Sequence, residues 1–279
     1  MAPRTPSTKG ITTSPRRRLR GRLRFRSGLI TNPSVAVPSF FTLMNLFCGF
    51  LAITQVHTGQ FTYACYLIVL AGFFDLLDGM MARLTHGHSL FGVELDSLSD
   101  IVSFGVAPSY LVFALMFEDA GAFGLIVAAL PAMCAAVRLA RFNVNFDGEK
   151  KVDFEGLPAP AQAWFIVALV LNIEADAWLA RAGVLDTATL TPVIIVLALL
   201  MVSTIRFDGV PRISVAYVRA HPVASSAYLA AVILFVFFRH AGLLVTLVVY
   251  VTIGLIRATA RAMKLVFAGL PDENGVQDV

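Results

Sequence analysis

The stretch "FFDLLDGMMARLTHGHSLFGVELDSLSD", from Phe73 to Asp100, decides how this sequence is interpreted. Apolar segments lie on both sides of it, "YLIVLAG" before and "IVSFGVAPSYLVFALMF" after, yet it contains four aspartates. A charged side chain at the centre of a membrane-spanning helix costs about 2.5–3.5 kcal/mol. Four carboxylates in such a setting therefore indicate a functional site. They are Asp75, Asp78, Asp96 and Asp100.

The composition indicates a membrane protein with several spanning helices. The chain has 279 residues, of which 57% are hydrophobic and only 14% are charged. Soluble globular domains are typically about 45–50% apolar and about 25% charged. We therefore predict an all-α polytopic membrane protein without an evident soluble domain. Cys48, Cys65 and Cys134 lie in apolar stretches without metal-ligand spacing, and we expect them to pack inside helices.

We expect eight membrane-spanning helices within a catalytic domain at residues 34–264, since about 20 residues are needed to cross the hydrocarbon core. Their expected limits are 34–57, 61–84, 93–117, 121–143, 158–176, 189–205, 223–239 and 241–263. Residues 1–33 are expected to form a basic tail that can include a short interfacial helix. Residues 265–279 are expected to form a short second tail.

The distribution of basic residues predicts the orientation in the membrane. Seven arginines fall between Arg16 and Arg26, in "RRRLRGRLRFR". Such a run can bind nucleic acid, but directly before a membrane domain it favours a cytoplasmic tail that faces lipid. With eight crossings, only Arg181 and Arg239 among the 22 Lys and Arg residues fall in outside loops. The positive-inside rule then predicts that both termini are cytoplasmic.

Helical spacing predicts that the four aspartates converge. Asp75 and Asp78 are three residues apart, and Asp96 and Asp100 are four apart, so each pair lies on one helix face. The connection between the two helices, at 84–91, is short, which makes the helices antiparallel neighbours. Both pairs lie within about two turns of the same membrane surface. They can therefore meet in one cavity near the cytoplasmic interface.

Carboxylates gathered in this way need neutralising charge. Four unneutralised carboxylates in one cavity would repel each other strongly. Oxygen ligands favour hard divalent ions such as Mg²⁺, Mn²⁺ or Ca²⁺, and two ions about 4 Å apart would suit phosphoryl chemistry. Gly79 and Ala82 share a stripe with the first pair and leave a groove for a flat base or a phosphate. The alternative interpretation is helix-end groups that face water, which explains one pair more easily than all four.

The arrangement of these residues resembles the signature of the CDP-alcohol phosphotransferase family, D-x2-D-G-x2-A-R-x8-G-x3-D-x3-D. Its fixed positions are here Asp75, Asp78, Gly79, Ala82, Arg83, Gly92, Asp96 and Asp100. Five stretches are similar to the bacterial and archaeal phosphatidylserine synthases: "FTLMNLFCGFLA" at 41–52, "ELDSLSDIVSFGVAPSYL" at 94–111, "RLARFNV" at 138–144, "FEGLPAPAQA" at 154–163 and "LMVSTIRF" at 200–207. Where the family usually has "GLPSPAAA"-like runs, Gln162 replaces a small residue.

The resemblance implies the CDP-alcohol phosphotransferase fold and a reaction. CDP-diacylglycerol would donate its phosphatidyl group to the hydroxyl group of L-serine, and CMP would leave. The four aspartates would hold two divalent cations, Mg²⁺ or Mn²⁺, and Asp100 would also be the general base. The residues implied in binding the CDP-lipid are Thr42, Asn45, Gly79, Ala82, Arg83 and Ser89. Family members are typically homodimers in the membrane.

The acceptor site is less strongly indicated. Arg138, Arg141 and Asn143 are candidates for binding the acceptor or a phosphate, because guanidinium groups suit planar anions. Ordinary anchoring of arginines at the inner membrane face is the alternative. The stretch "GLPAPAQ" at 156–162 is interpreted either as a simple helix start or as an acceptor-site loop.

Two other functions stay open at this point. The same transfer to inositol, choline, glycerol or glycerol phosphate would differ only in the acceptor pocket. A divalent-cation transporter would also place carboxylates inside the membrane. Here, however, the aspartates cluster near one surface, and no polar stripe continues through the other predicted helices. We therefore expect a transferase of the cell (inner) membrane with its active site near the cytoplasmic face and no nucleic-acid partner.

Overall fold

The computed structural model describes residues 33–85, 89–144, 156–175, 187–205, 207, 240–261 and 263. Within these ranges all regular elements are helices, and none is a strand. Four helical stretches are long and apolar enough to cross a membrane: Val35–His57, Phe61–Leu84, Leu90–Val144 and His240–Arg261. Two shorter apolar helices lie at Ala159–Glu174 and Thr187–Val202. The prediction of an all-helical chain with several apolar spans is confirmed for this part of the protein.

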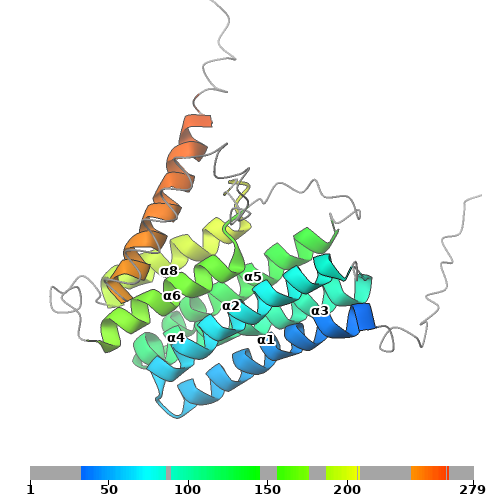
Figure 1. Cartoon of the computed structure of the whole chain (residues 1–279). Coiled ribbons are helices and arrows are strands. Elements are labelled where there is room, and N and C mark those ends of the chain that lie inside the picture. Colours follow the sequence, from blue (N-terminus) through cyan, green and yellow to red (C-terminus); the bar gives the residue numbers. More distant parts are fainter. Residues whose placement is uncertain are drawn as a thin grey trace, which may run out of the picture.

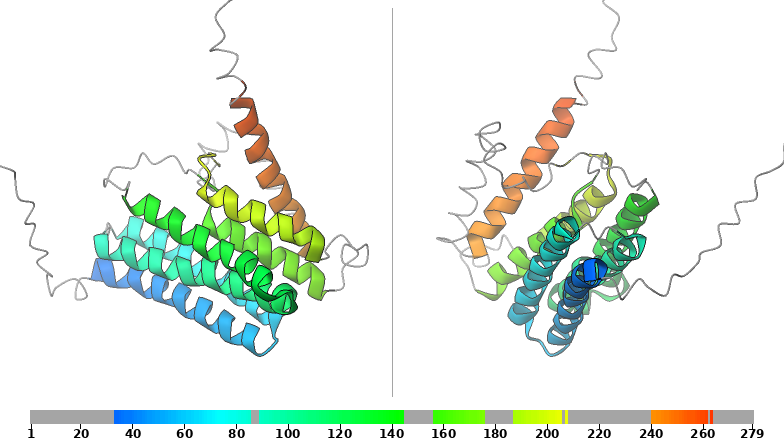
Figure 2. Two further views of the ribbon diagram at one scale, coloured as in Figure 1. Left: turned by 180° about the vertical axis from the view of Figure 1, so that it is seen from behind. Right: turned by 45° about the vertical axis from the view of Figure 1, so that its right-hand side comes forward.

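The first two helices form an antiparallel pair. α1 (Pro33–His57) and α2 (Phe61–Leu84) lie side by side in Figures 1 and 2. The turn between them contains Gly59, whose φ of 73° lies in the left-handed region that glycine tolerates without strain. This hairpin places the second half of α2, which holds the first two aspartates, beside the first half of α1.

The 55-residue stretch Leu90–Val144 folds back on itself. Its elements are, in order, α3 (Leu90–Asp100), the π-helix η1 (Ile101–Val106), α4 (Ala107–Val112), the π-helix η2 (Phe113–Phe117), the 3-10 helix η3 (Glu118–Ala120) and α5 (Gly121–Val144). The chain reverses at Gly121, where φ is 58°, and α5 returns alongside the preceding helices. Asn143 Nδ2 donates to Ser97 Oγ over 3.0 Å, which joins the two ends. The stretch therefore passes through the bundle twice.

Shorter helices complete the described bundle. α6 (Ala159–Glu174) packs against α2, and α8 (Thr187–Val202) packs against α5. The helix at His240–Arg261 begins near the end of α6 and then runs away from the bundle at a steep angle (Figures 1 and 2). Asn172 Nδ2 donates to the backbone oxygen of His240 over 2.9 Å and ties the start of this helix to α6.

The predicted limits agree closely with several observed helices. Those of α1, α2 and α5 differ by no more than one residue from the predicted 34–57, 61–84 and 121–143. The third helix was predicted from residue 93 but begins at Leu90, because Ser89 caps it by accepting the Gly92 N–H over 3.0 Å. The predicted span 223–239 and the two tails, apart from Pro33, fall outside the described residues.

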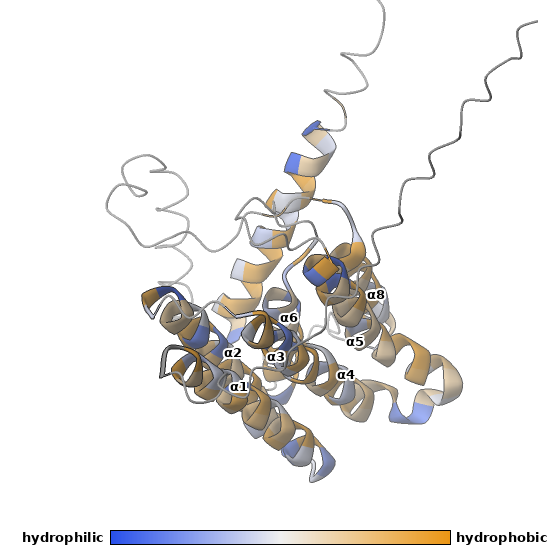
Figure 3. Ribbon diagram, turned by 90° about the vertical axis from the view of Figure 1, so that its right-hand side faces the viewer, coloured by the Kyte–Doolittle hydropathy of each residue, from blue (hydrophilic) through white to orange (hydrophobic). Residues whose placement is uncertain are grey.

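Hydrophobic side chains cover most of the bundle. In Figure 3 hydrophobic colours dominate along the helices, and hydrophilic residues gather mainly toward the helix ends. Cys48, Cys65 and Cys134 are buried and unpaired, as predicted. Hydrophobic residues along the helices, with hydrophilic residues toward the helix ends, are expected of a protein whose outer surface contacts lipid.

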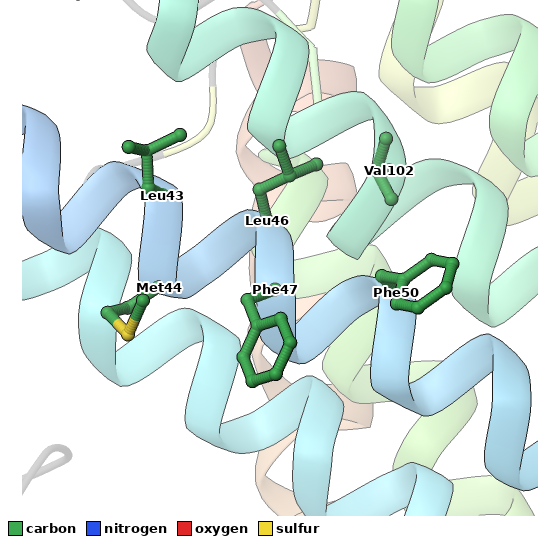
Figure 4. A pocket seen from close by; sticks show the side chains of 6 residues that line it. All are labelled: Leu43, Met44, Leu46, Phe47, Phe50 and Val102. Carbon is green, nitrogen blue, oxygen red and sulfur yellow. The ribbon is translucent and has the colours of Figure 1, made fainter.

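One outward face of α1 carries a shallow apolar hollow of about 530 Å³ (Figure 4). Its lining residues are Leu43, Met44, Leu46, Phe47, Phe50 and Val102. Phe47 and Phe50 are 52% and 57% exposed, whereas Thr42 and Asn45 on the same helix are buried. Thr42 and Asn45 therefore point into the bundle, away from this hollow.

Candidate active site

Three aspartates from two helices meet inside the bundle. α2 contributes Asp75 and Asp78, and α3 contributes Asp96. One carboxylate oxygen of each residue lies within 4.8 Å of the others. Asp78 is buried, with 6% of its surface exposed, and the other two are half-buried. We refer to Asp75, Asp78 and Asp96 as the carboxylate triad.

The atoms of the carboxylate triad suit a cation. Asp78 Oδ2 and Asp96 Oδ1 are buried and have no hydrogen-bond partner. A buried carboxylate oxygen without a partner is costly, so a neutralising charge stabilises such a group. The donors are all carboxylate oxygens, which Mg²⁺ and Mn²⁺ prefer. The residues present therefore fit a divalent cation.

Asp100 lies one turn beyond Asp96 and has different surroundings. Its side chain is 8% exposed and lies within electrostatic range of all three members of the carboxylate triad. Asn45 Nδ2 donates to Asp100 Oδ1 over 3.1 Å. Because Asn45 is fully buried in α1, this contact fixes the orientation of the Asp100 carboxylate. Only one of its two oxygens is engaged in this way.

Asn45 is held in place by its own neighbours. Ser103 Oγ donates to the backbone oxygen of Asn45 over 2.9 Å. One turn further along α1, a methyl group at Gly49 would lie 2.8 Å from the Ser103 Cα, so only glycine allows this approach of α1 to η1. The π-helix η1 begins directly after Asp100, and π-helical turns are frequent at functional sites. This contact of α1 with η1 was not predicted from the sequence.

The residues predicted to bind the CDP-lipid lie on α1, on α2 and directly before α3. Thr42 of α1 lies beside Asp78. Gly79 is exposed, and a methyl group built on it would meet no atom within 4 Å. No atom of a neighbouring helix therefore occupies the space at Gly79, and the groove for the CDP-lipid stays a prediction. Ala82 is half-buried, and Arg83 is exposed at the end of α2.

Ser89 has a local role in the structure. Its side-chain oxygen accepts the Gly92 N–H and so caps α3. A methyl group at Gly92 would lie 3.2 Å from that oxygen, which explains why a small residue suits this position. The contact of Ser89 with a CDP-lipid stays a prediction.

The three candidate acceptor residues of α5 have separate environments. Arg138 lies within electrostatic range of Asp100, and its Nε is buried without a hydrogen-bond partner. Arg141 donates to the backbone oxygens of Val202 and Ser203 over 3.0 and 3.3 Å, which ties α5 to the end of α8. Of the two arginines, Arg138 is therefore the one beside the aspartates.

Asn143 belongs to a different network. Its Nδ2 donates to Ser97 Oγ over 3.0 Å and to Glu94 Oε2 over 3.3 Å, which joins the end of α5 to α3. Asn143 therefore lies at the same end of the bundle as the aspartates, but its amide is engaged by α3. Its contact with an acceptor stays a prediction.

The stretch "GLPAPAQ" begins α6 and is attached to the end of α8. The N–H of Gly156 donates to the Ile205 oxygen over 2.8 Å, and the N–H of Leu157 donates to the Leu200 oxygen over 3.0 Å. Gly156 has a φ of 81°, and a side chain there would collide with the backbone oxygen of Met201. Glycine is therefore required at this position. These contacts favour a helix start over a free loop.

Comparisons with known proteins agree with this geometry. The family described as CDP-alcohol phosphatidyltransferase matches residues 35–202, which include the four aspartates and the residues around them. A CDP-diacylglycerol–serine O-phosphatidyltransferase of Helicobacter pylori is 37% identical over 182 residues, which cover 65% of this chain and 76% of that protein.

Similar proteins also occur in archaea and yeast. An archaetidylserine synthase of Methanothermobacter thermautotrophicus is 35% identical over 181 residues, covering 63% of this chain and 71% of that protein. A CDP-diacylglycerol–serine O-phosphatidyltransferase of Saccharomyces cerevisiae is 39% identical over 161 residues, covering 52% and 55% respectively. With its carboxylate triad inside the matched region, the chain belongs to the CDP-alcohol phosphatidyltransferase family.

Proposed function

We propose that this protein transfers the phosphatidyl group of CDP-diacylglycerol to the hydroxyl group of L-serine and releases CMP. The observation that carries the proposal is the carboxylate triad, which lies inside the region shared with the family. The acceptor follows the relatives in Helicobacter pylori and Saccharomyces cerevisiae, which are serine O-phosphatidyltransferases. CDP-diacylglycerol and L-serine are thus the proposed substrates.

Divalent cations belong to the proposed site. We infer that Asp75, Asp78, Asp96 and Asp100 together hold two ions, Mg²⁺ or Mn²⁺. When bound, such ions offset the charge of the pyrophosphate and of the departing CMP. The unpartnered oxygens of Asp78 and Asp96 support this assignment, because each has a lone pair that no protein group uses.

Asp100 is the proposed general base. It accepts the proton of the serine hydroxyl group while the serine oxygen forms a bond to the phosphorus that carries the diacylglycerol. The bond from that phosphorus to the bridging oxygen breaks, and CMP leaves with this oxygen. A carboxylate is a weak base near neutral pH, so its position matters most. The contact of Asn45 with Asp100 supports this role, because it holds the carboxylate in one orientation.

The remaining polar residues are assigned to substrate binding. The open space at Gly79 supports binding of the CDP group beside Asp78. Thr42, Ala82, Arg83 and Ser89 are proposed to border the same space. Arg138 is proposed to contact the acceptor or a phosphate, which its place near Asp100 supports.

The proposed topology has eight membrane spans, with both termini and the active site on the cytoplasmic side of the cell membrane. Apart from the four aspartates and Glu94, the basic and acidic residues of α1 to α8 separate along the described bundle. Arg83, Arg138 and Arg141 lie toward the end that holds the aspartates, and Glu118, Asp119 and Glu174 lie toward the opposite end. This separation supports the orientation, since cytoplasmic ends are enriched in Lys and Arg.

The proposed assembly is a homodimer whose catalytic domain occupies residues 34–264. Mass determination of the purified protein in detergent would test the dimer.

An acceptor panel tests the function. Purified protein with CDP-diacylglycerol and Mn²⁺ would be given L-serine, inositol, choline, glycerol or glycerol 3-phosphate, and the release of CMP would be followed. Release should depend on L-serine, and the lipid product should be phosphatidylserine. If CMP release requires another alcohol, the transfer reaction stands and that alcohol replaces L-serine as the acceptor. No CMP release with any alcohol would contradict the transferase assignment.

A further inference from the structure

Buried polar atoms without partners lie on two helices that surround the site. Gln162 of α6 is fully buried, and neither its Oε1 nor its Nε2 has a hydrogen-bond partner. Arg138 of α5 has a buried Nε without a partner. Leaving a buried donor or acceptor unsatisfied is costly, so such groups are expected to meet a ligand or water.

Both residues lie at the same depth in the bundle. Arg141, one turn after Arg138, donates to the end of α8, and the residues just before Pro158 are also bonded to the end of α8. Gln162 follows Pro158 by one turn, since its N–H donates to the Pro158 oxygen over 3.1 Å. Arg138 and Gln162 therefore both lie about one helical turn, or about 5.4 Å, deeper in the bundle than the residues that contact the end of α8.

The same region adjoins the proposed base. η1, which follows Asp100 directly, packs against both α5 and α6. Arg138 lies within electrostatic range of Asp100. A ligand bound between Arg138 and Gln162 would therefore lie near the carboxylate that must accept the proton of the attacking hydroxyl group.

We propose that Gln162 and Arg138 form the pocket for the acceptor and that Gln162 contacts the charged groups of L-serine, an assignment that rests on the proposed function. An amino acid carries an ammonium group next to a carboxylate. The guanidinium donor of Arg138 suits the carboxylate. The amide of Gln162 offers an acceptor, Oε1, to the ammonium group and a donor, Nε2, to the carboxylate.

The chemistry of the amide distinguishes this ligand from the phosphates of the donor. A phosphate presents only acceptor oxygens, so it would satisfy Nε2 and leave the buried Oε1 without a partner. L-Serine can satisfy both atoms. Gln162 is therefore a specificity-determining residue for an acceptor that carries both charges.

The test replaces Gln162 by methionine, which retains the length of the side chain and removes both polar atoms. The KM for L-serine should rise about tenfold to a hundredfold, the effect expected when hydrogen bonds to charged groups are lost. The KM for CDP-diacylglycerol should change less than about twofold. Without serine, the thermal midpoint of Gln162→Met should equal or exceed that of the wild type, because the unsatisfied amide is gone. Serine added with Mn²⁺ and CMP should raise the midpoint of the wild type only.

Asn172→Leu is the matched control. Asn172 is another fully buried amide on α6, near the opposite end of the helix, where its Nδ2 contacts the Ala168 and His240 oxygens and its Oδ1 has no partner. Its replacement should lower the thermal midpoint and leave both KM values unchanged. Arg138→Lys should raise the KM for serine in the same way as Gln162→Met, because lysine loses the planar donor geometry.

Several results would overturn the inference. An unchanged serine KM in Gln162→Met, with or without a lower thermal midpoint, would assign Gln162 to packing or to a buried water. A rise in the KM for the lipid alone would assign it to the donor site. The wild type must first use serine in the acceptor panel, so failure of the proposed function would be seen separately from failure of this assignment.

Discussion

The four aspartates differ in what surrounds them. Asp75, Asp78 and Asp96 lie close together, and Asp78 and Asp96 each have a buried oxygen without a partner. Asp100 is instead held by the amide of Asn45. This difference supports a division in which the triad mainly binds cations and Asp100 mainly accepts a proton.

Asp78→Asn tests the triad. Asparagine retains the shape and removes the negative charge, so turnover should fall by about a hundredfold or more, as when an electrostatic contact to the transition state is lost. Steady-state release of CMP measures the effect. Asp119→Asn, an exposed change in η3 at the opposite end of the bundle, should leave turnover unchanged. Near-normal turnover in Asp78→Asn would remove this residue from the cation site.

Asn45→Ala tests the positioning of Asp100. Loss of a residue that orients a catalytic or metal-binding group typically costs about 10–100-fold in activity, and we expect this loss in kcat. The KM for CDP-diacylglycerol should change little. If that KM rises while kcat is retained, Asn45 contacts the lipid, as the family resemblance implies, and does not position the base.

At the scale of single residues, the sequence predicted which residue types form the site better than it predicted the contacts between them. The spacing of the aspartates was sufficient to predict that α2 and α3 bring carboxylates together, because helix geometry fixes which residues share a face. The partners of Asn45, Arg141 and Asn143 come from helices distant in the chain, so spacing alone does not reveal them. Gln162 carried one sequence signal, since it replaces a small residue of the run that the family usually has.

Close approaches between helices determine the shape of the site at the scale of elements. Gly49 lets α1 approach η1, and Gly156 lets the start of α6 lie against the end of α8. At Gly79 no protein atom fills the space that a side chain would take. Two of these glycines therefore serve packing, and the third borders open space, where we propose that the CDP group binds.

A pair of glycine substitutions separates these roles. Gly49→Ala should lower the free energy of unfolding by about 1–3 kcal/mol, because the new methyl group overpacks the contact with Ser103. Gly79→Ala should leave the thermal midpoint unchanged or slightly higher, since alanine favours helix, and should raise the KM for CDP-diacylglycerol. Thermal unfolding in detergent and steady-state kinetics would measure both. A stable Gly49→Ala and an unstable Gly79→Ala would reverse the assignment.

Helix limits were predictable because a spanning helix must contain about 20 apolar residues, and such runs are visible in the sequence. The π-helical turns η1 and η2 were not predicted. Hydropathy indicates which residues avoid water. It does not indicate whether a backbone N–H bonds to the third, fourth or fifth preceding residue, which distinguishes 3-10, α- and π-helices. The position of η1 directly after Asp100 is therefore a property of the packed bundle.

The orientation in the membrane belongs to the whole molecule. In the described helices Arg83, Arg138 and Arg141 lie toward the end that holds the proposed active site, and Glu118, Asp119 and Glu174 lie toward the opposite end. This distribution supports the proposed orientation, in which the site faces the cytoplasm, where CDP-lipids and serine are both available.

Cysteine labelling in a background without Cys48, Cys65 and Cys134 tests this orientation. Single cysteines in the loops at 84–91, 143–157 and 207–222 should react only from the cytoplasmic side. A cysteine in the loop at 174–189 should react from outside the cell. Opposite labelling of either set would contradict the eight-span topology with cytoplasmic termini.

The most direct measurement follows CMP release from CDP-diacylglycerol by the purified protein with L-serine, first in EDTA and then after Mn²⁺ or Mg²⁺ is restored. The gathered carboxylates of Asp75, Asp78, Asp96 and Asp100 predict no release in EDTA, and recovery of serine-dependent release with phosphatidylserine as product when the cation returns. Full turnover in EDTA, or release that does not depend on serine, would contradict a cation-dependent serine phosphatidyltransferase.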